Sequence, residues 1–316
     1  MLVACWRCRL AEQLQRPRSN ATTVMRSTQS RVLHAIGLFF LAILIHGCGA
    51  RGVAEYQLYT QAFSAQFEQG EVVLNAVAVA ERKLVLQAIK RRKRLEFRPD
   101  EAAYFVEAVD PPITGSIRAS SKALKSYNDA LGALANGEAA EALSNRVGTL
   151  VGNIVSAVTA ADVVLNGIER IEAANLLASK SKQTLLDVAP IIKQVATIAS
   201  RQEFRRQLLE SYRYMKELLL TLRDGTEVMF MVLERSRVEF GRGPKNPAVP
   251  KGAIADVEKD RVLLASWVIL IDKTIVAMEA AAAAAMTDID AVDLAALAES
   301  SIELRVLAEN VKKLRR

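Results

Sequence analysis

The chain has 316 residues, of which 51% are hydrophobic, 24% charged and only 5% aromatic. This hydrophobic content excludes a disordered chain, and 15 glycines and 8 prolines are too few for a collagen-like protein. The net charge of +7 would suit a partner that carries phosphate, but six arginines lie in residues 1–47 against a single acid, Glu12. The remainder is nearly neutral, so we expect no nucleic-acid partner.

Residues 1–47 have the pattern of a secretory leader. Arg26 and Arg31 form a charged region before the apolar segment Ala35–Ile45. That segment is too short to span a bilayer, because a spanning helix needs about 20 residues. A conventional signal peptide would occupy residues 25–47, whereas residues 1–24 are unusual for a charged region. The start could be Met1 or Met25, and we expect Met25, with residues 1–24 upstream of it.

The leader ends in the sequence Ile45-His46-Gly47-Cys48. This resembles the lipobox of bacterial lipoproteins, with a branched apolar residue at −3 and a small residue before the cysteine. The resemblance implies cleavage between Gly47 and Cys48 and diacylation of Cys48. Since Gly49 stands where lipoproteins of the inner membrane often have Asp, it also implies the periplasmic face of the outer membrane. An ordinary signal peptide and an uncleaved anchor are the alternatives.

Cleavage before Cys48 would change which chemistry the protein can perform. The two histidines, His34 and His46, would leave with the leader, as would Cys5 and Cys8, whose Cys-x-x-Cys spacing has no second pair beside it. The processed chain would lack the groups for Ser-His-Asp or Cys-His catalysis and for a His/Cys zinc site. We therefore expect no metal and no cofactor, and any enzyme here would depend on carboxylates, Lys, Tyr or Arg.

From residue 48 onward the apolar residues recur with helical spacing, and no stretch alternates as a strand does. On the first predicted helix the apolar residues form a stripe along one face, which includes Tyr59, Gly70 and Val77 and resumes after Glu81. The helices are predicted over 50–95, 114–135, 138–168, 170–200 with an interruption or bend at Pro190, 204–233, 253–285 and 288–314. The clearest linker is the Pro/Gly-rich loop 241–250.

These elements predict an all-α protein in which residues 48–316 form a single domain. Long amphipathic helices joined by short turns favour an elongated up-and-down bundle of six or seven helices. An α-solenoid-like array is the alternative. Gly148, Gly152 and Ser156 fall four residues apart, which predicts close helix packing inside this bundle. The uncharged run Val147–Ala161 is too short to span a membrane alone. The uncharged run Val262–Ile271 is also short and predicts a buried core helix.

Two kinds of charged cluster could carry function. The densest is a run of five cations at the end of the first predicted helix, Lys90, Arg91, Arg92, Lys93 and Arg94. It is either a solvated helix C-terminus or an anion-binding tip for lipid head groups or an acidic partner. The other kind is acidic, Glu169 with Glu172 and Asp288 with Asp290 and Asp293, whose positions near helix starts are expected from the helix dipole alone.

The sequence therefore predicts a lipid-anchored lipoprotein of the cell envelope whose helices serve as a scaffold or protein-binding surface. It would reach the membrane through Cys48 and would have a protein partner in the envelope. The alternatives are a membrane-perturbing helical toxin or its antagonist, and an envelope enzyme based on carboxylate or lysine chemistry. The sequence does not indicate which partner it binds or how many copies assemble.

Overall fold

The computed structural model describes residues 53–92, 96–136, 138–166, 172–195, 201–241, 251–286 and 291–313. By its contacts the chain divides into two units, Met1–Arg51 and Gly52–Arg316, and every described residue belongs to the second. All regular secondary structure in these ranges is helical, so the predicted all-α class is confirmed. The predicted leader, with Met25, Gly47 and Cys48, lies outside the described residues.

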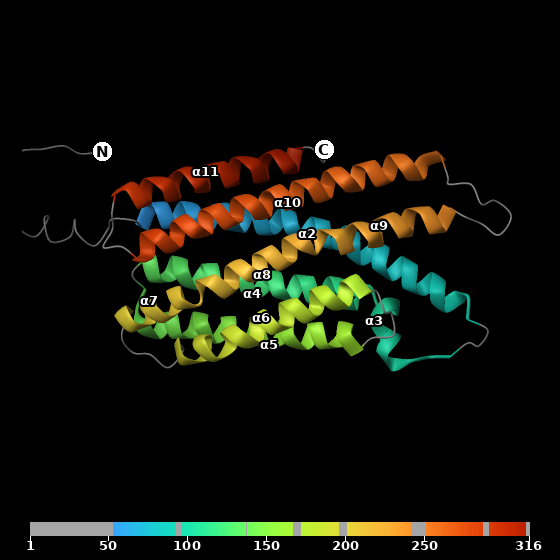
Figure 1. Ribbon diagram of the computed structural model, residues 1–316, viewed down its shortest axis with the longest axis horizontal. Helices are drawn as coiled ribbons and strands as arrows, with labels where there is room; N and C mark the ends of the chain where they lie inside the picture. The colour runs from blue at the N-terminus through green and yellow to red at the C-terminus, as the bar shows by residue number, and fades with distance from the viewer. Residues whose placement is uncertain are drawn as a thin grey trace, which may run out of the picture. The chain divides into compact units, whose positions relative to one another are not determined.

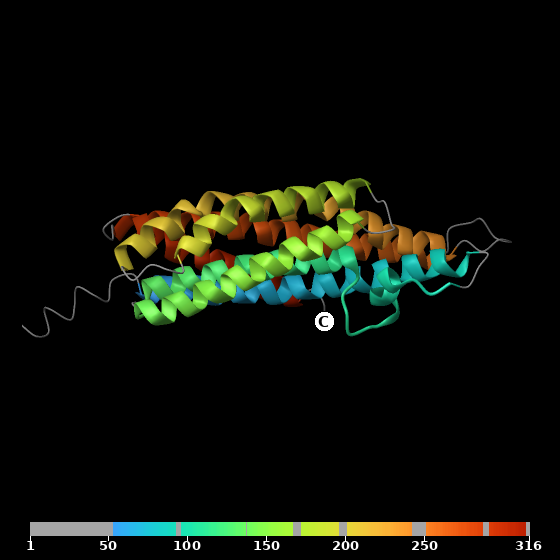
Figure 2. The ribbon, with the colours of Figure 1, turned by 90° about the horizontal axis from the view of Figure 1, so that it is seen from below.

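Within this second unit the long helices run side by side along one axis (Figures 1 and 2). Helices that follow one another in sequence pack together, α4 on α5, α5 on α6 and α10 on α11, which is the predicted up-and-down arrangement. The long helices are α2 (Val53–Lys90), α4 (Pro112–Ala135), α5 (Ala140–Asn166), α6 (Glu172–Val195), α10 (Lys251–Met286) and α11 (Ala291–Lys313). The consecutive helices α7 (Arg201–Glu210), α8 (Tyr212–Asp224) and α9 (Thr226–Gly241) form a further stretch, and η1 (Pro99–Glu101) and α3 (Ala102–Phe105) are short.

The helix predicted over 204–233 is divided into α7, α8 and α9 at two residues. Ser211 and Gly225 separate the three segments, yet both keep right-handed helical dihedral angles, with φ of −77° and −60°. The path of the chain therefore stays helical through both positions. At Gly225 a side chain would collide with Leu177 of α6, because an added Cβ would lie 2.8 Å from Leu177 Cδ2.

Other boundaries differ modestly from the prediction. Helix α2 ends at Lys90 rather than near residue 95. Helix α6 continues past Pro190 to Val195, so the predicted interruption is not found, and Pro190 is exposed there. A proline inside a helix removes one backbone hydrogen bond and crowds a carbonyl of the preceding turn, at a cost of about 3 kcal/mol. The buried side chains of Leu185, Val188 and Ile192 around it offset that cost. Residues 242–250 of the predicted loop lie outside the described residues, between the end of α9 and the start of α10.

Helix α2 is the central element of the bundle, because it packs against α4, α9, α10 and α11. Its predicted apolar stripe is the buried one, and Tyr59, Leu74 and Val77 are at most 1% exposed. Full burial of a large apolar side chain contributes about 1.5–3 kcal/mol. The helix is therefore held on several sides by hydrophobic packing, and it positions the charged groups at its C-terminal end.

Candidate functional site

Some of the predicted site residues lie in the described part of the chain, and others lie outside it. Gly47 and Cys48 lie outside the described residues, so the lipidation site stays a prediction. Helix α2 begins at Val53, five positions after Cys48. Of the basic run, Lys90 and Arg91 are exposed at the end of α2, and Arg92 is partly buried. Lys93 and Arg94 lie outside the described residues, as do Glu169, Asp288 and Asp290 of the acidic clusters.

Arg92 does not point freely into solvent with its neighbours. Its Nη1 lies 2.6 Å from Oε1 of Glu101, a carboxylate whose side chain is only 3% exposed. One member of the predicted anion-binding run therefore has its charge opposed inside the chain. This partner could not be predicted from the sequence, because Glu101 follows Pro99 and Asp100 and resembles a residue in the first turn of a short exposed helix.

The segment that carries Glu101 is fastened to the bundle by arginines. Arg82 of α2 donates from Nη2 to the backbone oxygen of Val109, at 2.7 Å. Arg118 of α4 pairs with Asp110 and with Glu71 of α2, the latter at 2.9 Å. These contacts fix η1, α3 and the following turn against the C-terminal half of α2.

A second buried carboxylate, Glu81, holds the start of α4. Its oxygens accept hydrogen bonds from Ile113 N at 3.0 Å, Thr114 N at 2.9 Å and Thr114 Oγ1 at 2.8 Å. The residue that precedes α4 is Pro111, which makes no side-chain cap of its own. Glu81 therefore accepts hydrogen bonds from amide groups that have no acceptor inside the helix. Its negative charge also interacts favourably with the positive end of the helix dipole. The signal for this role in the sequence is that Glu81, a charged residue, interrupts the predicted apolar stripe.

We expect Glu81→Gln to destabilise the folded protein by about 2 kcal/mol, because the amide can no longer accept from all three donors and the charge is lost. Urea unfolding followed by circular dichroism measures the change. Glu68→Gln, on the exposed face of the same helix, is the matched control and is expected to leave the midpoint unchanged. Equal midpoints for Glu81→Gln and the wild type would contradict this role.

A cavity of about 240 Å³ lies beside the Arg92–Glu101 pair, where the end of α2, α3, the start of α4 and the end of α5 meet. We call it the α3 pocket. Its walls are mostly apolar, with a few polar groups among them. It is lined by Val85, Arg92, Asp100, Glu101, Tyr104, Pro112, Ile113, Val163, Val164 and Asn166.

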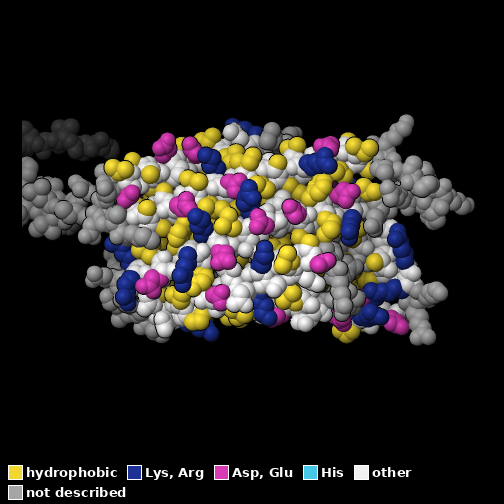
Figure 3. Space-filling model, in the orientation of Figure 1, with side chains coloured by type: hydrophobic (Ala, Val, Ile, Leu, Met, Phe, Trp, Pro, Cys, Tyr) yellow, Lys and Arg dark blue, Asp and Glu magenta, His cyan; other side chains and the backbone are white. Residues whose placement is uncertain are grey.

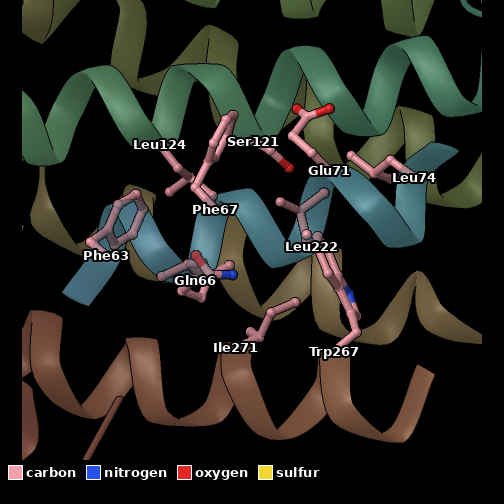
Figure 4. A pocket seen from close by; sticks show the side chains of 12 residues that line it. Phe63, Gln66, Phe67, Glu71, Leu74, Ser121, Leu124, Leu222, Trp267 and Ile271 are labelled. Carbon is pink, nitrogen blue, oxygen red and sulfur yellow. The ribbon is translucent and has the colours of Figure 1, made fainter. Parts of the chain in front are cut away.

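A second cavity lies in the core between α2, α4, α8 and α10 (Figure 4). Trp267 reaches from α10 toward α2 there, and Glu71 lies on the side of α4. The cavity measures only about 20 Å³, which is about the space that one water molecule needs. It is therefore a packing defect around Gly70 and Trp267 and is too small for a substrate.

The pKa shifts that the structure produces fall mainly on buried tyrosines. Burial raises the pKa of Tyr56, Tyr59 and Tyr127 far above the ordinary value, and it raises the pKa of Tyr212 to about 12. The Tyr59 hydroxyl donates to Asn128 Oδ1 and the Tyr56 hydroxyl donates to the backbone oxygen of Ala281. Tyr56 and Tyr59 therefore serve as core residues with satisfied hydroxyls, and they join α2 to α10 and α4.

The remaining resolved shifts belong to ion pairs nearer the surface. The Arg146 guanidinium beside Glu138 lowers the pKa of that carboxyl, and Asp260 raises the pKa of Arg237. On the face drawn in Figure 3, acidic and basic side chains are interspersed over the helices. In the described ranges no group of three or more His, Cys, Asp or Glu side chains is arranged to hold a metal ion.

The small residues of α5 do not lie where the sequence predicted. Gly148 and Gly152 are exposed, and a Cβ added at either would meet no atom within 4 Å. Ser156 is also exposed, and its hydroxyl donates to Gly152 O at 2.9 Å. The expected close packing of these residues inside the bundle is therefore wrong, because they face outward. Among the described helices, α5 is also the one long and apolar enough over Glu141–Asn166 to cross a membrane, a test that core helices of soluble bundles pass too.

Comparisons with protein-family models, with characterised proteins and with solved structures found no match. The geometry of the chain and its sequence are therefore the basis for any functional conclusion.

Proposed function

We propose that this protein is a lipid-anchored component of the cell envelope whose helical bundle acts as a scaffold or protein-binding module. The observation that carries the proposal is the lipobox-like sequence Ile45-His46-Gly47-Cys48, which stands five residues before the first described helix. An acylated Cys48 would be joined to α2 by residues 49–52 alone. Because an extended residue covers at most about 3.6 Å, the start of α2 would stay within about 20 Å of the membrane.

The length of α2 separates the proposed anchor from the basic run. Its 38 residues span about 57 Å at 1.5 Å per residue, with Lys90 at the end opposite Val53. On an upright bundle, Lys90 and Arg91 would face away from the anchoring membrane. This arrangement supports an acidic partner over the head groups of that same membrane as the target of the basic run. Gly49 supports the outer membrane as the anchoring membrane, by resemblance to sorted lipoproteins.

Cys48→Ser is expected to abolish lipid attachment and to move the protein out of the membrane fraction, because the acyl chains supply the membrane affinity. Radiolabelled palmitate incorporation and fractionation of the native host measure both effects. Ser30→Ala, inside the leader that begins at Met25, is the matched control and is expected to change neither. Label that persists in Cys48→Ser, or a wild-type protein that takes up no label and keeps its leader, would overturn the proposal.

The membrane-perturbing alternative has one observation in its favour, the apolar helix α5, whose exposed residues between Gly148 and Thr159 carry no charge. It predicts that the purified protein releases dye from liposomes. The enzymatic alternative predicts a pocket with two ionisable groups whose pKa values shift in opposite directions. In the described part of the chain the resolved shifts fall on core tyrosines and on surface ion pairs, which give that alternative no support.

A further inference from the structure

The α3 pocket contains a buried carboxylate whose hydrogen bonding is incomplete. Glu101 is 2% exposed, and neither Oε1 nor Oε2 has a hydrogen-bond partner among the described residues. Arg92 Nη1 neutralises Oε1 by charge at 2.6 Å, but its N–H groups are not aligned with either oxygen. An ionised carboxylate offers about four acceptor positions, and leaving them empty in a buried place costs free energy. A molecule with donors would recover that energy.

The walls of the pocket define the rest of the ligand. Val85, Ile113 and Val164 are buried and apolar, whereas Asp100 and Val163 are exposed, so the pocket opens to solvent on their side. The volume of about 240 Å³ exceeds the roughly 150 Å³ of an apolar cavity that admits benzene. The occupant therefore combines a hydrogen-bond donor with an apolar body of one ring or a short chain.

The charged side chains that line the pocket determine whether a bound ligand should be positively or negatively charged. Asp100 and Glu101 supply two carboxylates against the single guanidinium of Arg92. An ammonium group placed beside Glu101 Oε2 would complete the neutralisation and would donate up to three hydrogen bonds. Arg92 Nη1 also lacks a hydrogen-bond acceptor, but an anion that reached it would lie against the two carboxylates of Asp100 and Glu101, which is unfavourable.

We propose that the α3 pocket binds a small organic cation, an ammonium group carried on an apolar body, with Glu101 as its counter-ion. This goes beyond the scaffold role and does not depend on acylation of Cys48. The ammonium contacts Glu101, the apolar body lies on Val164 and Ile113, and Val163 forms the rim.

The test is a titration of the full-length protein, held in long-chain maltoside micelles and labelled at Ile and Val methyl groups. Phenethylamine is the cationic probe, and 2-phenylethanol and phenylacetate are its neutral and anionic counterparts of similar shape. We expect phenethylamine to shift the methyl signals of Ile113, Val85 and Val164 saturably, and phenylacetate to leave them in place. Unmoved signals with phenethylamine, or tighter binding of phenylacetate, would overturn the proposal.

Two variants locate the effect within the pocket. Glu101→Gln keeps the shape of the side chain and removes its charge, and we expect it to weaken phenethylamine binding by about tenfold or more. Val163→Trp blocks the rim from a position that is 50% exposed, so it tests the pocket without disturbing the core. Val155→Trp, 52% exposed on the same helix and outside the pocket, is the matched control. Equal binding to Val163→Trp and Val155→Trp would also rule out the site.

Discussion

Replacing Gly70 with valine is expected to destabilise the protein by about 3 kcal/mol, because no space exists for the added side chain. A Cβ at this position would fall inside van der Waals contact with Cζ3 of Trp267, and 3.2 Å from its Cη2. Trp267 is 2% exposed, and the cavity beside it has only about 20 Å³ to receive a displaced ring (Figure 4). Urea unfolding at neutral pH gives the change in stability.

The controls for Gly70→Val are substitutions of two glycines that are exposed to solvent. Gly148→Ala and Gly152→Ala lie on the exposed face of α5, where an added Cβ meets nothing within 4 Å. Alanine in an exposed helix interior is favoured over glycine by about 1 kcal/mol, so each is expected to stabilise the protein. Replacing glycine should therefore destabilise the protein in α2 and stabilise it in α5.

A second-site change tests the cause directly. Trp267→Leu removes the ring that Gly70 approaches, so the double variant Gly70→Val/Trp267→Leu should lose less stability than the two single losses predict when added. An additive double variant would show that Trp267 is not the obstacle. A Gly70→Val protein as stable as the wild type would show that the core of α2 and α10 has more freedom than the described packing allows.

The periodicity of the sequence predicts the helices and their buried stripes well, because both follow from local spacing. The spacing predicts that Tyr59 and Val77 lie on the apolar stripe of the first helix, and both are fully buried. Gly70 was placed there as well, and its burial against Trp267 shows why a glycine suits the stripe. A helix face is fixed by residues three and four apart, so no knowledge of distant partners is needed.

The features that could not be predicted from the sequence are contacts between residues that lie far apart in the chain. Glu81 interrupts the apolar stripe visibly, but its partners at the start of α4 lie about thirty residues further along the chain. Glu101 has no pattern that marks it as buried, because its burial depends on how the short α3 segment folds back on Arg92. Spacing placed Gly148 and Gly152 on one face of a helix, but spacing alone does not decide whether that face is inward or outward.

Above about pH 10 the protein is expected to lose stability steeply, by about 5 kcal/mol for each pH unit, because three buried tyrosines and the partly buried Tyr212 resist ionisation. Burial raises the pKa of Tyr56, Tyr59 and Tyr127 above their ordinary value of 10.0, most strongly for Tyr59, which also faces the other tyrosines. The folded state keeps these protons while the unfolded chain releases them. Stability is therefore complete below the unfolded pKa and falls as pH rises toward the folded values.

Urea midpoints measured between pH 9 and pH 11.5, together with tyrosinate absorbance, follow this loss. Tyr127→Phe removes one of the four groups, so its stability should decline about three quarters as steeply with pH as that of the wild type. At neutral pH the same variant should lose about 1 kcal/mol, because the hydrogen bond with Ser211 is gone. Tyr127 is the one residue that differs between the two proteins, so the difference between the two slopes measures its contribution. Parallel slopes would mean that Tyr127 ionises as easily in the bundle as in the unfolded chain, and its burial between α4 and α8 would then be wrong.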